Sequence, residues 1–90
     1  MEPVVVEARP LPRYRAWVRF SDGVSGEVDL SHLIGKGLFA RWRQPGEFER
    51  LAVDPHAGTI TWPGGLDVAP DALHERIVSG LPKTRQSAGG

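Results

Sequence analysis

A chain of 90 residues with 11 basic and 11 acidic side chains and no cysteine is one small domain, without disulfides or a cysteine-based metal site. The balanced charge excludes a strong overall attraction to nucleic acid or to an anionic membrane. The N-terminus has no signal-peptide pattern, and no apolar stretch approaches the roughly 20 residues of a membrane helix. We therefore expect a cytoplasmic protein.

Two strands are predicted near the N-terminus. The first is residues 4–8, a β-branched run that Pro10 and Pro12 should end. The second is residues 13–20, where apolar and polar side chains alternate with a period of two. Its inward face carries Tyr14, Ala16, Val18 and Phe20. Its outward face carries three guanidinium groups and one indole, from Arg13, Arg15, Trp17 and Arg19.

Residues 24–30 alternate again, so they should form a hairpin with the second strand across Ser21-Asp22-Gly23. A two-residue turn would drive the carboxylate of Glu27 into the core. A three-residue loop with Gly23 in the left-handed conformation avoids this, and we predict it. It gives the cross-strand pairs Phe20–Val24, Ala16–Val28, Arg15–Asp29 and Trp17–Glu27.

The middle of the chain predicts short helices interrupted by glycine and proline. Ser31 can cap a turn over residues 31–34. A second helical segment covers residues 38–44 and ends at Pro45-Gly46. Three of its side chains share one face: Leu38, Phe39 and Trp42.

A second hairpin is predicted from residues 51–54 and 59–62, joined by a four-residue loop. That loop pairs apolar side chains with each other: Val53–Ile60 and Leu51–Trp62. A C-terminal helix should begin at Pro70, with Leu73 and Ile77 facing the sheet.

Together these elements predict an α+β fold. We expect a small antiparallel sheet of about five strands, made of two hairpins plus the N-terminal strand, with short helices and a C-terminal helix packed on it. A single domain should cover residues 1–81. Residues 82–90 are small and polar without apolar periodicity, so we predict a flexible C-terminal tail.

One motif is distinctive: Trp62-Pro63-Gly64-Gly65, followed by Asp67 and by Pro70-Asp71-Ala72-Leu73. It is similar to a pattern of Trp-Pro-Asn-Gly, then Asp, then Pro-acid-x-Leu, found in the bacterial family called domain of unknown function 2442. The resemblance spans roughly residues 4–78. Two positions depart from the pattern, because Gly64 replaces the usual Asn and His74 stands where an aromatic residue is common.

The resemblance implies a small αβ fold without an assigned activity. Some relatives look fused to a helix-turn-helix domain, and others look paired with a second small protein in the manner of toxin–antitoxin modules. This sequence contains no helix-turn-helix domain beside the predicted fold. We expect the residues of the family motif to have mainly structural roles. They are Trp62, Pro63, Gly65, Asp67, Pro70 and Leu73.

The leading candidate site is the outward face of the second strand: Arg13, Arg15, Trp17 and Arg19. Arginine presents a planar donor fork to phosphate or carboxylate, and tryptophan offers a stacking face or an interface anchor. The same pattern is also typical of a solvated strand face, whose positive charges Glu27 and Asp29 would partly balance. A solvated face, a protein interface and a nucleic-acid interface therefore all stay open.

The remaining polar residues favour structural roles. Asp67 follows a glycine turn and precedes a helix, so we expect it to accept hydrogen bonds from Gly65 or from the first turn of the helix. The three histidines lie in separate elements without metal-ligand spacing, so no metal site is expected. No nucleophile-elbow serine and no phosphate-binding loop are present.

We therefore expect a non-catalytic protein-interaction or regulatory module without cofactor, metal or small-molecule ligand. Its partner should be another protein or a second copy of the chain. The alternative is an accessory nucleic-acid-binding domain that uses Arg13, Arg15 and Arg19. A third class is a small enzyme, which would need His74 and Asp67 in one pocket.

Overall fold

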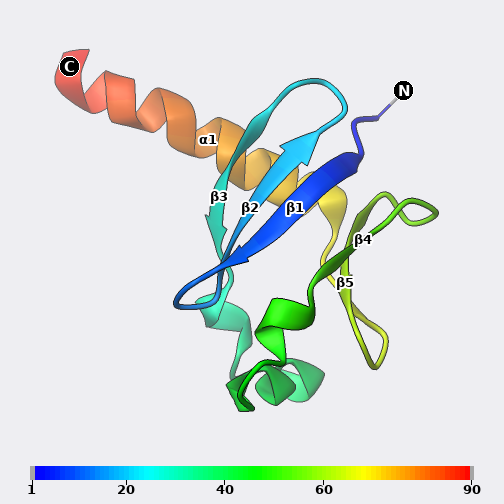
Figure 1. The fold of residues 1–90 in the computed structure, drawn as a ribbon. Helices are drawn as coiled ribbons and strands as arrows, with labels where there is room; N and C mark the ends of the chain where they lie inside the picture. The colour runs from blue at the N-terminus through cyan, green and yellow to red at the C-terminus, as the bar shows by residue number, and fades with distance from the viewer. Residues whose placement is uncertain (1, 90) are drawn as a thin grey trace.

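The computed structural model describes the backbone of residues 2–89 and the side chains of residues 2–79. Within this range it has two three-stranded antiparallel sheets, three short 3₁₀ helices and one α-helix, so the predicted α+β class is confirmed (Figure 1). The strands divide between two sheets instead of forming one sheet of about five. The predicted boundary of the domain at residue 81 and the predicted flexible tail at 82–90 are not tested and stay predictions.

Sheet A consists of β1 (Val5–Leu11), β2 (Arg15–Phe20) and β3 (Ser25–Asp29), with β2 in the centre. The register between β2 and β3 is the one predicted from alternation. It contains the pairs Arg15–Asp29, Ala16–Val28 and Trp17–Glu27.

The loop between β2 and β3 has the predicted three residues. The Phe20 amide donates to the Val24 carbonyl oxygen at 2.8 Å, and Gly23 takes a φ of 90°. The Asp22 carboxylate adds a hydrogen bond from the Val24 amide at 3.0 Å. Glycine is needed at the third position because the left-handed conformation is strained for other residues.

The first strand does not end at its prolines. It continues to Leu11, and Pro10 lies opposite Ala16. The Leu30 amide donates to the Tyr14 carbonyl oxygen, so the backbone groups of Tyr14 point towards β3. Backbone groups of residues two apart in a strand point to the same side, so the amide of Ala16 also points towards β3. The nitrogen of Pro10 then faces away from β2, and the edge strand loses no ladder bond.

The predicted start of the second strand at residue 13 is wrong. β2 begins at Arg15, and the two preceding residues lie in the β1–β2 turn with φ angles of 66° for Arg13 and 60° for Tyr14. Tyr14 remains half-buried, as the alternation predicted, but Arg13 is not on the face of the strand.

Sheet B consists of β4 (Ala52–Asp54), β5 (Thr59–Trp62) and β6 (Leu66–Asp67). The predicted pair of Val53 with Ile60 is confirmed. The register is therefore the predicted one, but the ladder begins at Ala52, so the predicted pair of Leu51 with Trp62 lies one residue beyond its end.

Trp62 instead pairs with Leu66 across the glycine turn. Its indole Nε1 donates to the Phe48 carbonyl oxygen at 2.8 Å, which ties sheet B to the helical segment before it.

The three 3₁₀ helices are η1 (Ser31–Leu33), η2 (Gly37–Arg43) and η3 (Phe48–Arg50). Gly35 lies between η1 and η2, and the Pro45-Gly46 turn separates η2 from η3. Ser31 does not cap η1 with its side chain. Its amide and hydroxyl both donate to the Asp29 carboxylate, at 2.9 and 2.6 Å.

The predicted common face of η2 is only partly formed. Trp42 is buried and Phe39 half-buried, with their ring centroids 5.1 Å apart, but Leu38 is 64% exposed. The expectation that all three side chains pack inward is therefore wrong for Leu38. The tighter winding of a 3₁₀ helix explains the exposure of Leu38. Side chains three residues apart, such as Phe39 and Trp42, lie on the same side of a 3₁₀ helix, whereas side chains four apart, such as Leu38 and Trp42, do not.

The helix α1 (Pro70–Gly89) begins at the predicted proline. Its side chains Leu73 and Ile77 are 1% and 5% exposed. Ile77 packs against Gly26 of β3, where an added Cβ atom would lie 3.0 Å from the isoleucine side chain. The helix thus covers one face of sheet A and leaves the other open (Figure 1).

The hydrophobic core is one cluster that joins both sheets, the helices and the ends of the loops. Its aromatic part lies beside η2 and η3, where Trp42 contacts both Phe48 and Trp62 at centroid distances of 4.9 and 4.6 Å. The buried apolar members are Val5, Ala16, Val18, Phe20, Val28, Leu30, Trp42, Phe48, Ile60, Trp62, Leu66, Leu73 and Ile77.

Candidate functional site

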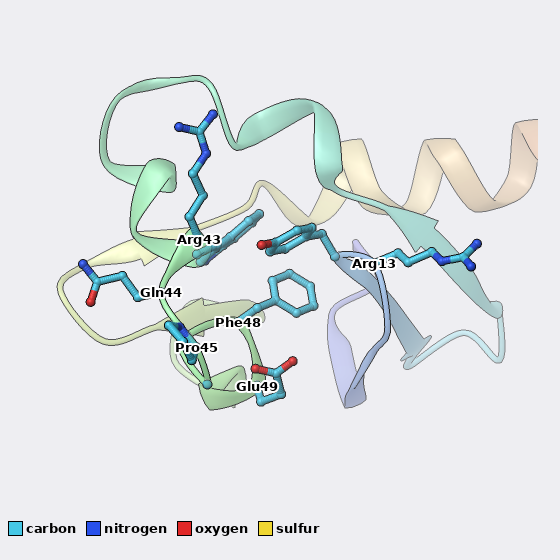
Figure 2. Close-up of a pocket in the computed structure, with 9 residues that line it drawn as sticks. Arg13, Arg43, Gln44, Pro45, Phe48 and Glu49 are labelled. Carbon is cyan, nitrogen blue, oxygen red and sulfur yellow. The ribbon is translucent and has the colours of Figure 1, made fainter.

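The first candidate surface is a concavity of about 260 Å³ where the aromatic core reaches the surface (Figure 2). We call it the aromatic concavity. Its ring-bearing walls are Tyr14, Trp42 and Phe48, and charged side chains surround them: Arg13, Arg43 and Glu49. Phe48 meets the Tyr14 ring edge to face, with centroids 5.5 Å apart and an angle of 83°.

One wall of the aromatic concavity is a tight turn. Pro45 and Gly46 occupy its centre, Gly46 has a φ of 82°, and the Glu47 amide donates to the Gln44 carbonyl oxygen at 3.1 Å. Proline followed by a left-handed glycine is typical of a type II turn. Sequence reasoning missed this concavity because its lining comes from two separate regions of the chain. The sequence feature that could have indicated the concavity is the Pro-Gly turn between Trp42 and Phe48.

The second candidate surface is the outer face of sheet A, which faces away from α1. The register places on it alternate residues of all three strands. These are Glu7, Arg9, Leu11, Arg15, Trp17, Arg19, Ser25, Glu27 and Asp29. It includes three of the four residues of the predicted site and omits Arg13.

A β-bulge brings Glu7 to this face. Val5 pairs with Phe20 on the inner side, whereas Glu7 pairs with Arg19 on the outer side. Val6 is therefore the additional residue of the bulge, and it is 44% exposed. If the chain alternated strictly from Val5 with no bulge, the Glu7 carboxylate would point into the core.

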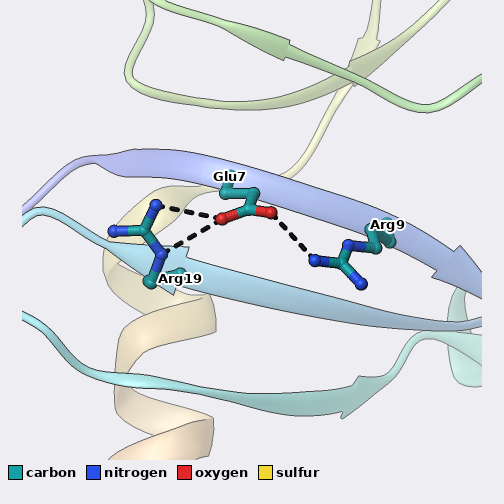
Figure 3. A network of polar contacts seen from close by, with 3 residues as sticks. All are labelled: Glu7, Arg9 and Arg19. Atoms are coloured by element: carbon teal, nitrogen blue, oxygen red, sulfur yellow. Dashed lines mark hydrogen bonds and ion pairs between the residues drawn. The ribbon is translucent and has the colours of Figure 1, made fainter.

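The Glu7 carboxylate binds two arginines at once (Figure 3). Arg9 donates to Oε2 at 3.0 Å, and Arg19 donates to Oε1 from Nη2 at 2.9 Å and from Nε at 3.2 Å. The hydrogen bonds from Arg9 and then from Arg19 hold the pKa of Glu7 below its ordinary value.

The ion pair of Arg15 runs diagonally. Its guanidinium lies 3.2 Å from the Glu27 carboxylate, although Asp29 is its direct cross-strand neighbour. Asp29 is engaged by Ser31, whose side-chain and backbone hydrogen bonds lower the pKa of the aspartate. The predicted pairing of Arg15 with Asp29 is thus correct for the backbone but not for the ion pair.

Trp17 is half-buried on the outer face and lies directly opposite Arg9. The guanidinium carbon of Arg9 is 5.0 Å from the centre of the indole, within the range of a cation–π interaction. Arg9 therefore joins Trp17 to Glu7 and, through it, to Arg19. The alternation of Glu7 and Arg9 before the first proline was the sequence signal for these two members.

The family motif serves mainly to shape the chain. Gly64 and Gly65 both have left-handed φ angles, 93° and 83°. A Cβ atom on Gly64 would meet the Arg41 guanidinium, which lies over this turn. Asp67 pairs with Thr61 in sheet B, and within the described residues its exposed carboxylate accepts neither of the hydrogen bonds predicted for it.

His74 and Asp67 do not share a pocket. His74 lines another concavity, of about 430 Å³, with Pro3, Pro70 and neighbouring acidic residues, and Asp67 is not part of it. His74 instead lies 2.8 Å from the Asp22 carboxylate and meets the Phe20 ring edge to face. The pKa of Asp22 is lowered by the Val24 amide first and by His74 second. This pair ties α1 to the β2–β3 loop.

The part of the chain that the structure describes holds no group of three metal-ligating side chains. It also forms no helix that is long and apolar enough to cross a membrane.

Comparison with known proteins identifies a family and nothing more specific. The family described as "Protein of unknown function (DUF2442)" matches residues 5–79. Neither curated proteins nor solved structures gave a match. Since the match covers most of the chain and includes the motif at residues 62–73, this protein belongs to the DUF2442 family.

Proposed function

We propose that this protein is a non-catalytic protein-interaction module with a regulatory role, and that the outer face of sheet A binds its partner protein. The observation that carries the proposal is Trp17, which is held in place by Arg9 on a sheet face that α1 leaves open.

Trp17 has the properties of an interface anchor. Tryptophan and arginine are the residue types most enriched among those that dominate binding energy. Its ring is half-buried and lies against Arg9, so little side-chain freedom remains to be lost when a partner covers it.

The charges of the outer face favour a protein partner over nucleic acid. Three arginines and three carboxylates balance, and the side chains of Arg9, Arg15 and Arg19 each already contact a carboxylate. A phosphate backbone would have to displace these contacts, whereas a protein can add to them. The binding should therefore depend weakly on salt, unlike phosphate binding.

The first prediction is that Trp17→Ala abolishes partner capture. Immobilised wild-type chain, Trp17→Ala and the control Leu38→Ala are exposed to nuclease-treated lysate of the native host. Leu38 is also exposed but lies outside the outer face. A protein retained by wild type and by the control at about 0.5 M salt should be missing from Trp17→Ala.

The melting temperature of Trp17→Ala should stay close to that of wild type, so that loss of capture reflects the surface and not unfolding. Sedimentation of the purified chain reveals whether the captured protein is a second copy. Equal capture by wild type and Trp17→Ala would show that the outer face is not the binding surface. Capture that disappears on nuclease treatment would instead support the nucleic-acid alternative.

A further inference from the structure

We propose that the aromatic concavity binds a carboxylate group, carried either by a small organic acid or by the C-terminus of a peptide. No residue of the outer face of sheet A lines this concavity, so the inference does not depend on the function proposed above. It departs from the expectation, drawn from sequence, that the protein has no small-molecule ligand.

The first argument is a hydrogen-bond donor without an acceptor. Trp42 lines the concavity and is only 2% exposed, and within the described residues its indole Nε1 has no hydrogen-bond partner. The neighbouring Trp62 donates its indole N–H to Phe48. Buried donors are nearly always satisfied, so an orphan beside a cavity points to an acceptor supplied by a ligand. A carboxylate oxygen is such an acceptor.

The second argument is charge. Arg13 and Arg43 line the concavity, and among the described side chains neither guanidinium forms an ion pair, while Glu49 is the single acidic group of the lining. Figure 2 shows the side chains of Arg13 and Arg43 extending away from Phe48 in different directions, so that neither covers its ring. Four arginines elsewhere have carboxylate neighbours: Arg9, Arg15, Arg19 and Arg50. A guanidinium fork is suited to a carboxylate, and these two long side chains can turn towards one.

The third argument is size. A volume of about 260 Å³ is slightly below the roughly 300–1,000 Å³ of pockets that hold drug-sized ligands. It suits a single residue or an organic acid of similar size. The half-buried ring of Tyr14 offers an apolar contact for the body of such a ligand.

The walls of the concavity are suited to adjust on binding. The Trp42 nitrogen exposes less than 1 Å² of surface, so an acceptor reaches it only if its wall moves. That wall is η2, a 3₁₀ segment of seven residues, and such helices have weaker hydrogen-bond geometry than α-helices. On the opposite side, Arg13 and Tyr14 hold left-handed backbone angles, a strain that clusters at ligand sites.

The test follows the indole N–H signals of the full chain in nitrogen–proton correlation spectra. The chain has three tryptophans, and Trp42→Phe identifies the Trp42 signal by its loss. The probes are N-acetylphenylalanine, which carries a carboxylate, and its uncharged primary amide at equal ionic strength. The acid should move the Trp42 signal in a saturable way, and the amide should bind at least about tenfold more weakly.

The signal of Trp17 serves as an internal control, because Trp17 lies on the outer face of sheet A and does not line the concavity. The double variant Arg13→Gln with Arg43→Gln should remove the preference for the acid over the amide. Arg50→Gln is the matched control, since Arg50 is exposed nearby but does not line the concavity. A Trp42 signal that ignores both probes, or that responds equally to both, would overturn the proposal.

The source of the carboxylate is distinguished by a third probe, a tetrapeptide ending in phenylalanine with a free C-terminus. Affinity at least about tenfold above that of the single acetylated residue would assign the site to a protein C-terminus. Equal affinity would assign it to a small organic acid. Both results keep the carboxylate site, and neither bears on the outer face of sheet A.

Discussion

At the scale of single residues, the two buried tryptophans of the aromatic core differ in one hydrogen bond. Trp62 donates its indole N–H to the Phe48 carbonyl oxygen, whereas Trp42 has no acceptor within the described residues. Their burial is nearly equal, at 4% and 2% exposed. Comparing the same substitution at the two tryptophans therefore separates the contribution of the hydrogen bond to stability from the contribution of packing.

We predict that Trp62→Phe lowers the free energy of unfolding more than Trp42→Phe, by about 1 kcal/mol or more. Both changes remove similar ring volume. Only the first breaks a hydrogen bond, and the second removes a buried donor that has none. Urea denaturation of the two variants beside wild type measures the difference. Equal losses would mean that the bond to Phe48 contributes nothing net.

Single residues also decide what the outer face of sheet A becomes. The bulge at Val6 turns the Glu7 carboxylate outward, where it binds Arg9 and Arg19. The same two arginines would otherwise give the face a net positive charge. The orientation of one carboxylate therefore decides whether this face is neutral or carries a net positive charge.

At the scale of elements, the contact between β3 and α1 rests on a glycine. Gly26 is on the inner face of sheet A, where a larger side chain would be expected from the alternation around it. Its lack of a side chain lets Ile77 approach, because an added Cβ atom would lie 3.0 Å from the isoleucine. Close approach of a second element is a common reason for glycine within a strand.

We predict that Gly26→Val lowers the free energy of unfolding by about 1–3 kcal/mol, because the valine forces α1 away from the sheet. Gly35→Val is the control, since a Cβ atom there meets nothing within 4 Å. Adding Ile77→Ala to Gly26→Val should recover part of the loss. Calorimetry or chemical denaturation checks all three variants, and an unrecovered loss would place the cause in β3 itself.

Much of this architecture follows from alternation in the sequence. The β2–β3 register was predictable because a shift of one residue would have buried Glu27. The start of α1 was predictable from Pro70. Pro10 misled the prediction because a proline is tolerated on an edge strand, and edge position is a property of the whole sheet.

The candidate sites were predictable to a smaller degree. Period-two alternation identified Arg15, Trp17 and Arg19, but it could not show that the strand begins after Arg13. The aromatic concavity depends on residues 13–14 meeting residues 42–49, a long-range contact without local periodicity. Such a contact becomes visible only when both segments are placed in space.

At the scale of the whole molecule, hydrogen bonds to three carboxylates connect neighbouring elements of the fold. Glu7 joins β1 to β2, Asp22 joins the β2–β3 loop to His74 of α1, and Asp29 joins β3 to the start of η1. Each of these carboxylates has a pKa held below its ordinary value by hydrogen bonds. Acid should therefore act on several element boundaries at once.

A carboxylate whose pKa is lower in the folded than in the unfolded chain stabilises the fold above its ordinary pKa, and this stabilisation disappears as the pH falls through the folded value. The ordinary values are 4.5 for Glu7 and 3.8 for Asp22 and Asp29. We predict that the melting temperature is nearly level above these values and falls as the pH drops below them. The triple variant with Glu7→Gln, Asp22→Asn and Asp29→Asn should melt at a lower temperature at neutral pH and show a flatter acid limb. A variant whose acid limb is as steep as that of wild type would mean that other carboxylates govern acid unfolding.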